Sequence, residues 1–121
     1  MYADGLTIDA SYEYGIYLNT GGMLLLRNSV IRNIKKGFWD FSSDKHHGVG
    51  IVKSNWKEPR PYCLLDNVRF ENCSEIGIEA EGEVLSYNST FHKCGKDSVG
   101  QIKQLEKSPN MDMEGFFAKE F

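Results

Sequence analysis

The sequence predicts an all-β solenoid, a single small domain built from short parallel strands. Three segments share one signature, in which an Asn is followed by a large apolar residue at the third position and a small or aliphatic one at the sixth. They are Asn28 with Ile31 and Ile34, Asn67 with Phe70 and Cys73, and Asn88 with Phe91 and Cys94. A fixed offset of this kind marks a repeat, and a repeat decides the fold before local propensity does.

The start of the chain fits the same register and brings the number of copies to about four. Ile8 falls at the large apolar position and Ser11 at the small one, while Gly5 replaces the Asn. Successive copies are 23, 39 and 21 residues apart, which is typical of one solenoid turn of short strands, since helical-pair repeats need about 34 or more residues. The long middle spacing indicates an insertion in the second turn.

Each turn contains two further apolar strands. One is introduced by a small residue, and the other lies just before the Asn. The first set is Gly15 to Leu18, Gly48 to Ile51, Gly77 to Ala80 and Ser98 to Gln101, and the second is Met23 to Leu26, Cys63 to Leu65 and Val84 to Leu85. Three short strands per turn, with side chains pointing alternately in and out, predict a parallel β-helix.

The turn pattern N-x-x-[IF] followed by G-[IV], over roughly residues 5 to 102, resembles the right-handed parallel β-helix proteins of the pectate-lyase-like group. The resemblance implies a right-handed coil of about four turns. Members of this group include polysaccharide lyases, glycoside hydrolases, phage tailspikes, adhesins and intracellular scaffolds. The function must therefore be argued from the site rather than from the fold.

Equivalent positions predict two columns of stacked side chains. Asn28, Asn67 and Asn88 should lie above one another at one corner, each amide donating to one turn and accepting from the other, as in the asparagine ladder of the group. We expect Asn88 to be buried, which disfavours glycosylation of the sequon Asn88-Ser89-Thr90. Cys73 and Cys94 should stack as small apolar thiols. A disulfide between them is the less favoured alternative, and metal binding is lower still because no CxxC or Cys-His spacing is present.

Two insertions flank one strand of the second turn and predict a carbohydrate site. They span about residues 37 to 47 and 53 to 61, on either side of the strand 48 to 51. Solenoid insertions gather as loops on one face, often the binding face, and the resemblance places a substrate cleft there. The residues expected to contact a sugar are Trp39, Trp56, His46, His47, Arg60 and Tyr17. In the alternative interpretation, the loop aromatics only pack the loops onto the coil.

Catalysis has weaker support in the sequence. The outward positions of this strand stack are predicted to be Tyr17, Gly50 and Glu79, which include one carboxylate. The calcium-holding carboxylate cluster that the resemblance would imply for a lyase is therefore not met. We expect no cofactor and no metal, with calcium the one alternative that the resemblance leaves open. A hydrolase needs two carboxylates roughly 5 to 10 Å apart, for which Asp40, Asp44 and Glu79 are the candidates. All three are equally typical of solvated turn residues.

Composition excludes several function classes. The formal charge of the 121 residues is −3, without a basic run, which argues against binding a nucleic-acid backbone. No stretch approaches the roughly 20 apolar residues of a membrane-spanning helix, and no signal-peptide pattern opens the chain. The compartment stays open, and an extracellular parent protein is compatible with the resemblance.

The two ends of the chain differ. After Pro109, the residues Met113, Phe116, Phe117 and Phe121 recur at helical spacing and predict an amphipathic cap. The domain therefore divides into coil turns over residues 1 to 102 and a capping segment over 103 to 121. Repeat register begins by Gly5, so the first turn should expose strand edges. We expect self-association there, or further turns upstream.

Two functions are consistent with this sequence. The first is a module of a larger polysaccharide-binding or polysaccharide-processing protein, with its site on the two loops. The second is a non-catalytic structural or protein-interaction module of the tailspike, adhesin or scaffold type. Whether the chain is an enzyme is left open by its residues.

Overall fold

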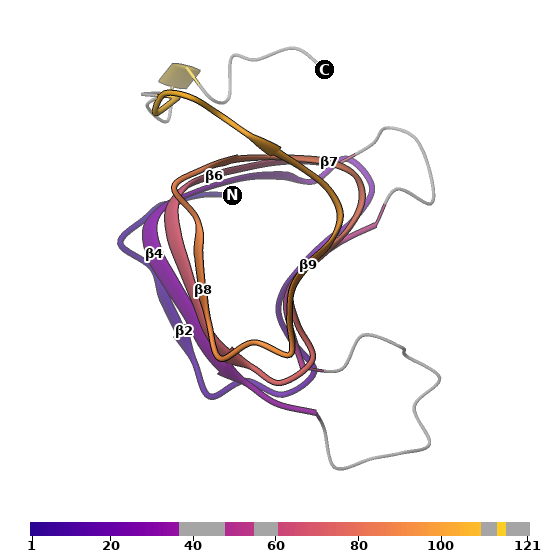
Figure 1. The fold of residues 1–121 in the computed structure, drawn as a ribbon. Coiled ribbons are helices and arrows are strands. Elements are labelled where there is room, and N and C mark those ends of the chain that lie inside the picture. The colour runs from indigo at the N-terminus through magenta and orange to yellow at the C-terminus, as the bar shows by residue number, and fades with distance from the viewer. Residues whose placement is uncertain (37–47, 55–60, 110–113, 116–121) are drawn as a thin grey trace.

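The computed structural model describes residues 1–36, 48–54, 61–109 and 114–115, and these residues form an all-β structure. The strands are mostly parallel and belong to one curled sheet, which wraps around a central core (Figure 1). They are β1 (Tyr2–Asp4), β2 (Thr7–Asp9), β3 (Tyr14–Leu18), β4 (Met23–Ile34), β5 (Val49–Lys53), β6 (Tyr62–Cys73), β7 (Ile76–Tyr87), β8 (Thr90–His92) and β9 (Lys96–Gln104). Among these residues, no helix is long and apolar enough to span a membrane.

The sheet divides into three stacks of parallel segments, because the long strands bend around corners. Stack A contains residues 2–4, 23–27, 62–66, 84–87 and 101–104. Stack B contains residues 7–9, 29–34, 68–73 and 90–92. Stack C contains residues 14–18, 49–53, 76–80 and 96–99. The chain visits A, B and C in that order and then returns to A, an arrangement compatible with the predicted parallel β-helix.

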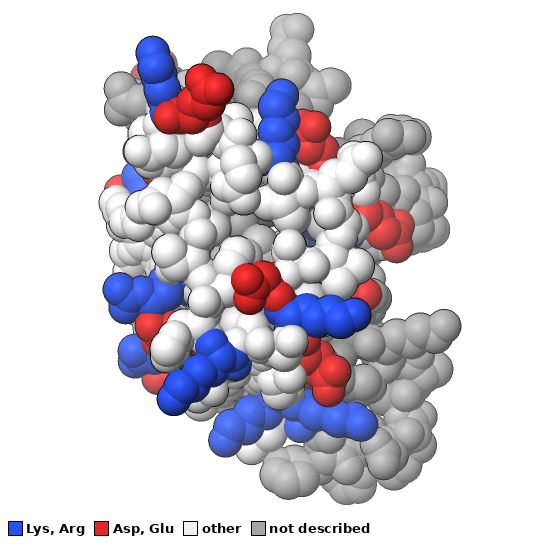
Figure 2. Space-filling view, in the orientation of Figure 1, with Lys and Arg blue, Asp and Glu red and all other residues white. Residues whose placement is uncertain are grey.

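The view in Figures 1 and 2 looks along the stacks, with the last turn nearest the viewer. In Figure 2, much of the surface facing the viewer is uncharged, and charged side chains of both signs are scattered around it. This last turn is the most exposed part of the sheet, since eight of the nine residues of β9 are exposed to solvent.

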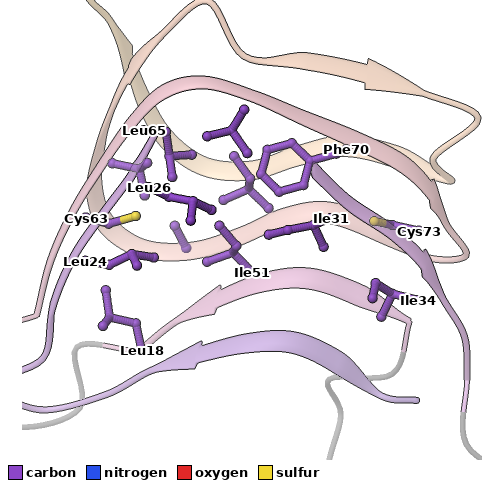
Figure 3. Packing of buried hydrophobic residues seen from close by; sticks show 14 residues of the cluster. Leu18, Leu24, Leu26, Ile31, Ile34, Ile51, Cys63, Leu65, Phe70 and Cys73 are labelled. Carbon is purple, nitrogen blue, oxygen red and sulfur yellow. The ribbon is translucent and has the colours of Figure 1, made fainter. Parts of the chain in front are cut away.

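Inward-pointing columns fill the core. Phe70, Ile31 and Leu65 are fully buried (Figure 3), and the rings of Phe70 and Phe91 are stacked with centroids 5.1 Å apart. Ile8 and Phe91 occupy the two ends of one such column and are only partly buried. The core is therefore a column that is best covered in its middle turns.

The predicted asparagine ladder is present at the corner between stacks A and B. The Asn67 amide donates to Oδ1 of Asn28 at 2.8 Å, and the Asn88 amide donates to Oδ1 of Asn67 at 3.2 Å. All three Asn have the left-handed backbone that such a corner requires, with φ between 48° and 58°. The expectation that Asn88 is buried was wrong, because it lies on the outside of the corner and is exposed. Burial therefore gives no argument against glycosylation.

A second ladder, which was not predicted, lies at the corner between stacks B and C. The Asn72 amide donates to Oδ1 of Asn33 at 3.0 Å, and the Asn33 amide donates to Oδ1 of Asp9 at 2.7 Å. In the first ladder, the corresponding final acceptor is Asp4, 3.1 Å from the Asn28 amide. Both ladders therefore end in a carboxylate in the first turn.

The register of stack C differs from the prediction in the second and fourth turns. The sequence pattern aligned Gly48 with Gly15, whereas the structure pairs Ile16 with Ile51 and so places Gly50 beside Gly15. In the last turn, Ser98 pairs with Ile78, and Val99 pairs with Glu79 on the outer side. The prediction failed because an insertion precedes β5. Two glycines follow the insertion, Gly48 and Gly50, and both fit the pattern.

Gly50 is also not an outward position, contrary to the prediction. A Cβ placed on it would lie 2.5 Å from the carbonyl oxygen of Gly77 and 2.9 Å from Cδ1 of Phe70, inside the core. A Cβ on Gly15 would likewise meet Ile31, at 3.0 Å. The glycines therefore let stack C bend inward against the large side chains of stack B, and Figure 1 shows this inward bend at β9.

The three cysteines are free thiols. Cys73 is fully buried and lies in the column that contains Ile34 in the preceding turn, whereas Cys94 is partly exposed. Burial raises the pKa of Cys73 to about 12, and the neighbouring Cys94 thiol acts in the same direction. Cys73 therefore stays a neutral thiol, as expected for a small apolar core residue.

Beyond β9, the chain runs along the outer side of stack A. There, Leu105 packs against a cluster formed around Leu25 and Leu64, which point away from the core and are nevertheless buried. Ser108 Oγ donates to Asp66, which also forms an ion pair with Arg27 at 3.0 Å. The residues whose spacing predicted a helical cap, Met113, Phe116, Phe117 and Phe121, lie outside the described residues.

Candidate functional site

The outer side of stack C carries one column of side chains from all four of its segments. Tyr17, Val52, Glu79 and Val99 lie side by side in register. Because side chains alternate along a strand, this column points away from the core, whose side is lined by Ile16, Ile51 and Ile78. Val52 is buried, while Tyr17 and Val99 are 38% and 41% exposed. The column therefore presents apolar surface at two points with a carboxylate between them.

A hollow of about 160 Å³ lies beside this column, between β5, β7 and β9. It is lined by Val52, Lys53, Ser54, Glu79, Ala80, Glu81 and Val99. Ligand pockets usually measure about 300 to 1,000 Å³, so this hollow is large enough for one small ring or polar group. A longer ligand would have to extend from it along the surface.

Lys53, at the end of β5, is a buried residue of the hollow that the sequence did not single out. In register it stands between Leu18 and Ala80, both of which are core residues. The residue is only 3% exposed, and its Nζ donates to the carbonyl oxygen of Glu81 at 3.0 Å. A buried ammonium at an apolar position is unusual unless it has hydrogen-bond partners. The burial of Lys53 could have been inferred from the sequence only with the correct register of stack C.

The positive charge of Lys53 also acts on the buried Cys63 thiol. Burial raises the pKa of Cys63 to about 12, and the charge of Lys53 opposes that shift without cancelling it. Cys63 is therefore a neutral thiol and contributes no negative charge to the hollow. Within the part of the chain that the structure describes, the ionisable groups that line the hollow are Lys53, Glu79 and Glu81.

Two of the site residues predicted from the sequence can be placed. Tyr17 and Glu79 belong to the same outward column and are separated by Val52, which corresponds to about 10 Å at the usual strand spacing. Tyr17 also packs against Tyr14, with ring centroids 5.3 Å apart. The predicted loop residues Trp39, Asp40, Asp44, His46, His47, Trp56 and Arg60 lie outside the described residues and stay predictions.

The described part of the hollow offers hydrogen-bond acceptors and apolar side chains. The carboxylates of Glu79 and Glu81 can accept hydrogen bonds from hydroxyl groups, and the exposed side chain of Val99 can contact an apolar ring face. Among the described residues, no group of three or more His, Cys, Asp or Glu side chains could hold a metal ion.

Comparisons with family models, with curated proteins and with solved structures give no match to this chain.

Proposed function

We propose that this chain is a right-handed parallel β-helix module, similar in its turns to the pectate-lyase-like group, that binds a polysaccharide or oligosaccharide on the outer side of stack C. Support for the coil comes from three stacks of parallel segments visited in a fixed order, with amide ladders at two corners. The proposed activity is binding, and the module would belong to a larger polysaccharide-binding or polysaccharide-processing protein.

The observation that carries the proposal is the hollow between β5, β7 and β9. It adjoins the strand that both insertions flank, so loop residues from either side can extend a surface that begins at Tyr17 and Glu79. In this proposal, Val99 contacts a ring face, and Glu79 accepts a hydroxyl hydrogen bond. Trp39 and Trp56 stack on further rings, and His46, His47 and Arg60 bind hydroxyl or carboxylate groups.

Calorimetric titration with neutral and acidic oligosaccharides tests this proposal. Glu79→Gln should weaken binding about tenfold, because a charged acceptor makes stronger hydrogen bonds than an amide. Trp39→Ala and Trp56→Ala should each weaken it as well, with little change in thermal stability. Glu71→Gln is the matched control, since Glu71 lies on the outer side of stack B. No binding by the unmodified chain, or equal loss in the control, would refute the proposal.

A second candidate function is a structural or interaction module, favoured by the exposed strands at the ends of the sheet. β9 is exposed over most of its length, and the outer residues of β2 are exposed as well. Exposed strands pair readily with other chains. In this case, the partner would be a protein, and self-association at the first turn is the form that the sequence favours.

A further inference from the structure

The two ends of the coil are both sheet edges. In the sheet of the described residues, β2 has β4 as its one neighbour and β8 has β6. Similarly, β3 is paired with β5, and the first half of β9 with β7. The first turn thus offers its outer edge on stacks B and C, and the last turn does the same at the opposite end. A sheet edge of this kind is a template for another strand.

The two ends carry opposite charge. Residues 1 to 22 contain Asp4, Asp9 and Glu13 and no Lys or Arg. Residues 88 to 109 contain four lysines, Lys93, Lys96, Lys103 and Lys107, against two acidic residues, Asp97 and Glu106. The net formal charge is therefore −3 for residues 1 to 22 and +2 for residues 88 to 109. Two first turns would repel each other, whereas a first turn and a last turn attract.

The side-chain columns indicate the same pairing. On the outer side of stack B, the column runs Asp9, Arg32, Glu71, His92, an acidic residue alternating with a basic one. The Arg32 and Asp9 side chains form an ion pair at 3.1 Å. After His92, the alternation calls for an acidic residue, which the Asp9 of a second copy would supply.

Apolar columns continue in the same way. Ile8 begins, and Phe91 ends, one inward column, and both are only partly buried. On stack C, Tyr17 begins and Val99 ends the outward column, and these two are among the few large apolar residues that are exposed. Placing a first turn on a last turn would set Ile8 against Phe91 and Tyr17 against Val99, and so would cover all four.

We propose that copies of this chain associate head to tail, with the first turn of one copy seated on the last turn of another. β2 of one copy lies alongside β8 of its neighbour, and β3 lies alongside the first half of β9. The interface is heterologous, so each copy keeps one first turn and one last turn available. Heterologous contacts form a ring only if the rotation between neighbouring copies closes the circle. We expect an open, linear chain of copies.

Stack A gives the junction a specific requirement. It has a fifth segment, residues 101–104, where stacks B and C have four segments each. In the assembly, this segment occupies the place beside β4 that β1 holds within its own chain. Residues 2–4 must therefore leave the sheet when the second copy is seated. The coil then continues from residues 101–104 of one copy into β2 of the next.

Head-to-tail association is a specific form of the second candidate function, the interaction module, and does not depend on saccharide binding. Sedimentation velocity over a range of concentrations tests it on the full chain. Association should be strong at low ionic strength and weaken as salt is added. Lys93→Glu should raise the dissociation constant about tenfold, because it places like charges at the junction. Lys36→Glu, the same charge change at an exposed residue of the second turn, should leave association unchanged.

Mixing two variants gives the most specific result. Asp9→Lys and Lys93→Glu should each associate poorly alone, but a mixture restores opposite charges at every junction and should recover association. Asp9→Lys removes the hydrogen bond from Asn33 and the ion pair with Arg32, which can prevent folding. In that case, the comparison of Lys93→Glu with Lys36→Glu still tests the proposal.

Hydrogen exchange adds a readout of geometry. On association, the amides of β8, β2 and β3 should exchange more slowly, and those of residues 2–4 should exchange faster. A chain that is monomeric at all concentrations at low salt would overturn the inference. So would association that Lys93→Glu leaves unchanged, or slower exchange confined to residues outside the two end turns. Oligosaccharide titration of the same samples reports separately on the saccharide proposal.

Discussion

Stack B and stack C are built from the same repeat, yet they differ in how their geometry is held. Stack B has an amide ladder at each of its corners, formed by Asn with left-handed backbone. Stack C instead depends on a glycine column that lets its backbone contact core side chains. Side-chain hydrogen bonds therefore hold the corners of stack B, while close packing shapes stack C. The hollow lies on stack C, and both insertions flank its strand β5.

The largest effect should come from filling the glycine column. Gly50→Ala places a Cβ 2.5 Å from the carbonyl oxygen of Gly77 and 2.9 Å from Phe70. Because the backbone oxygen belongs to a paired neighbouring strand, it can move little, and we expect a loss of about 3 kcal/mol in unfolding free energy. Denaturant unfolding followed by circular dichroism measures this.

Gly5→Ala is the matched control. It lies at a corner where an added Cβ meets nothing within 4 Å, but its φ is +78°. The expected loss is about 1 kcal/mol, from backbone strain alone. If Gly50→Ala were no more destabilising than Gly5→Ala, close packing would not be what shapes stack C.

The ladder of stack B should give an intermediate effect. Asn67 is the central rung, donating to Asn28 and accepting from Asn88. Asn67→Ala removes both bonds and places Ala in a left-handed backbone, so we expect a loss of about 1 to 3 kcal/mol in thermal or denaturant unfolding.

Asn67→Gly separates the two contributions, because Gly accepts the left-handed backbone. It should be less destabilising than Asn67→Ala but still destabilising, by an amount that reports the ladder itself. Equal stability of Asn67→Gly and the unmodified chain would mean that the amides contribute nothing and that backbone conformation alone keeps this corner.

The smallest effect concerns the acidic end of the second ladder. The hydrogen bond from Asn33 holds the pKa of Asp9 below its ordinary value of 3.8, with Arg32 acting in the same direction. Because the pKa of Asp9 is lower in the folded chain than in the unfolded chain, the ionised carboxylate stabilises the fold at pH values above the unfolded-state pKa. This stabilisation is lost as the pH falls through the folded-state pKa. The stability difference between the unmodified chain and Asp9→Asn should therefore be present near neutral pH and shrink in acid. A difference that persists at the lowest pH would show that charge is not involved.

The sequence allowed the parallel strands, the first ladder and the core column to be predicted, because each repeats at a fixed offset. The second ladder could have been found too, since Asn33 and Asn72 follow Asn28 and Asn67 by the same five residues. The register of β5 could not, because an insertion separates it from its anchor and both Gly48 and Gly50 fit the pattern. The burial of Lys53 depends on that register and was missed with it.

The candidate site was predictable only in outline. Tyr17 and Glu79 were correctly placed on the outer side of stack C, since alternation along a strand requires no knowledge of distant contacts. Gly50 was misplaced because alternation is interrupted where the backbone bends inward. Trp39, Trp56 and the other predicted loop residues lie outside the described residues, and no local pattern predicts the tertiary contacts of a long insertion.

The direction of the two ladders gives the coil an electrical polarity. In every rung, the amide nitrogen faces the first turn and the amide oxygen faces the last, so the side-chain dipoles point the same way along the axis. Aligned peptide dipoles create a positive end that favours anions at the start of an α-helix. Here the positive end of each row meets a carboxylate, Asp4 in one and Asp9 in the other. Two rows of side-chain amides on the outside of a sheet thus favour an anion at one end, as the backbone amides of an α-helix do at its N-terminus.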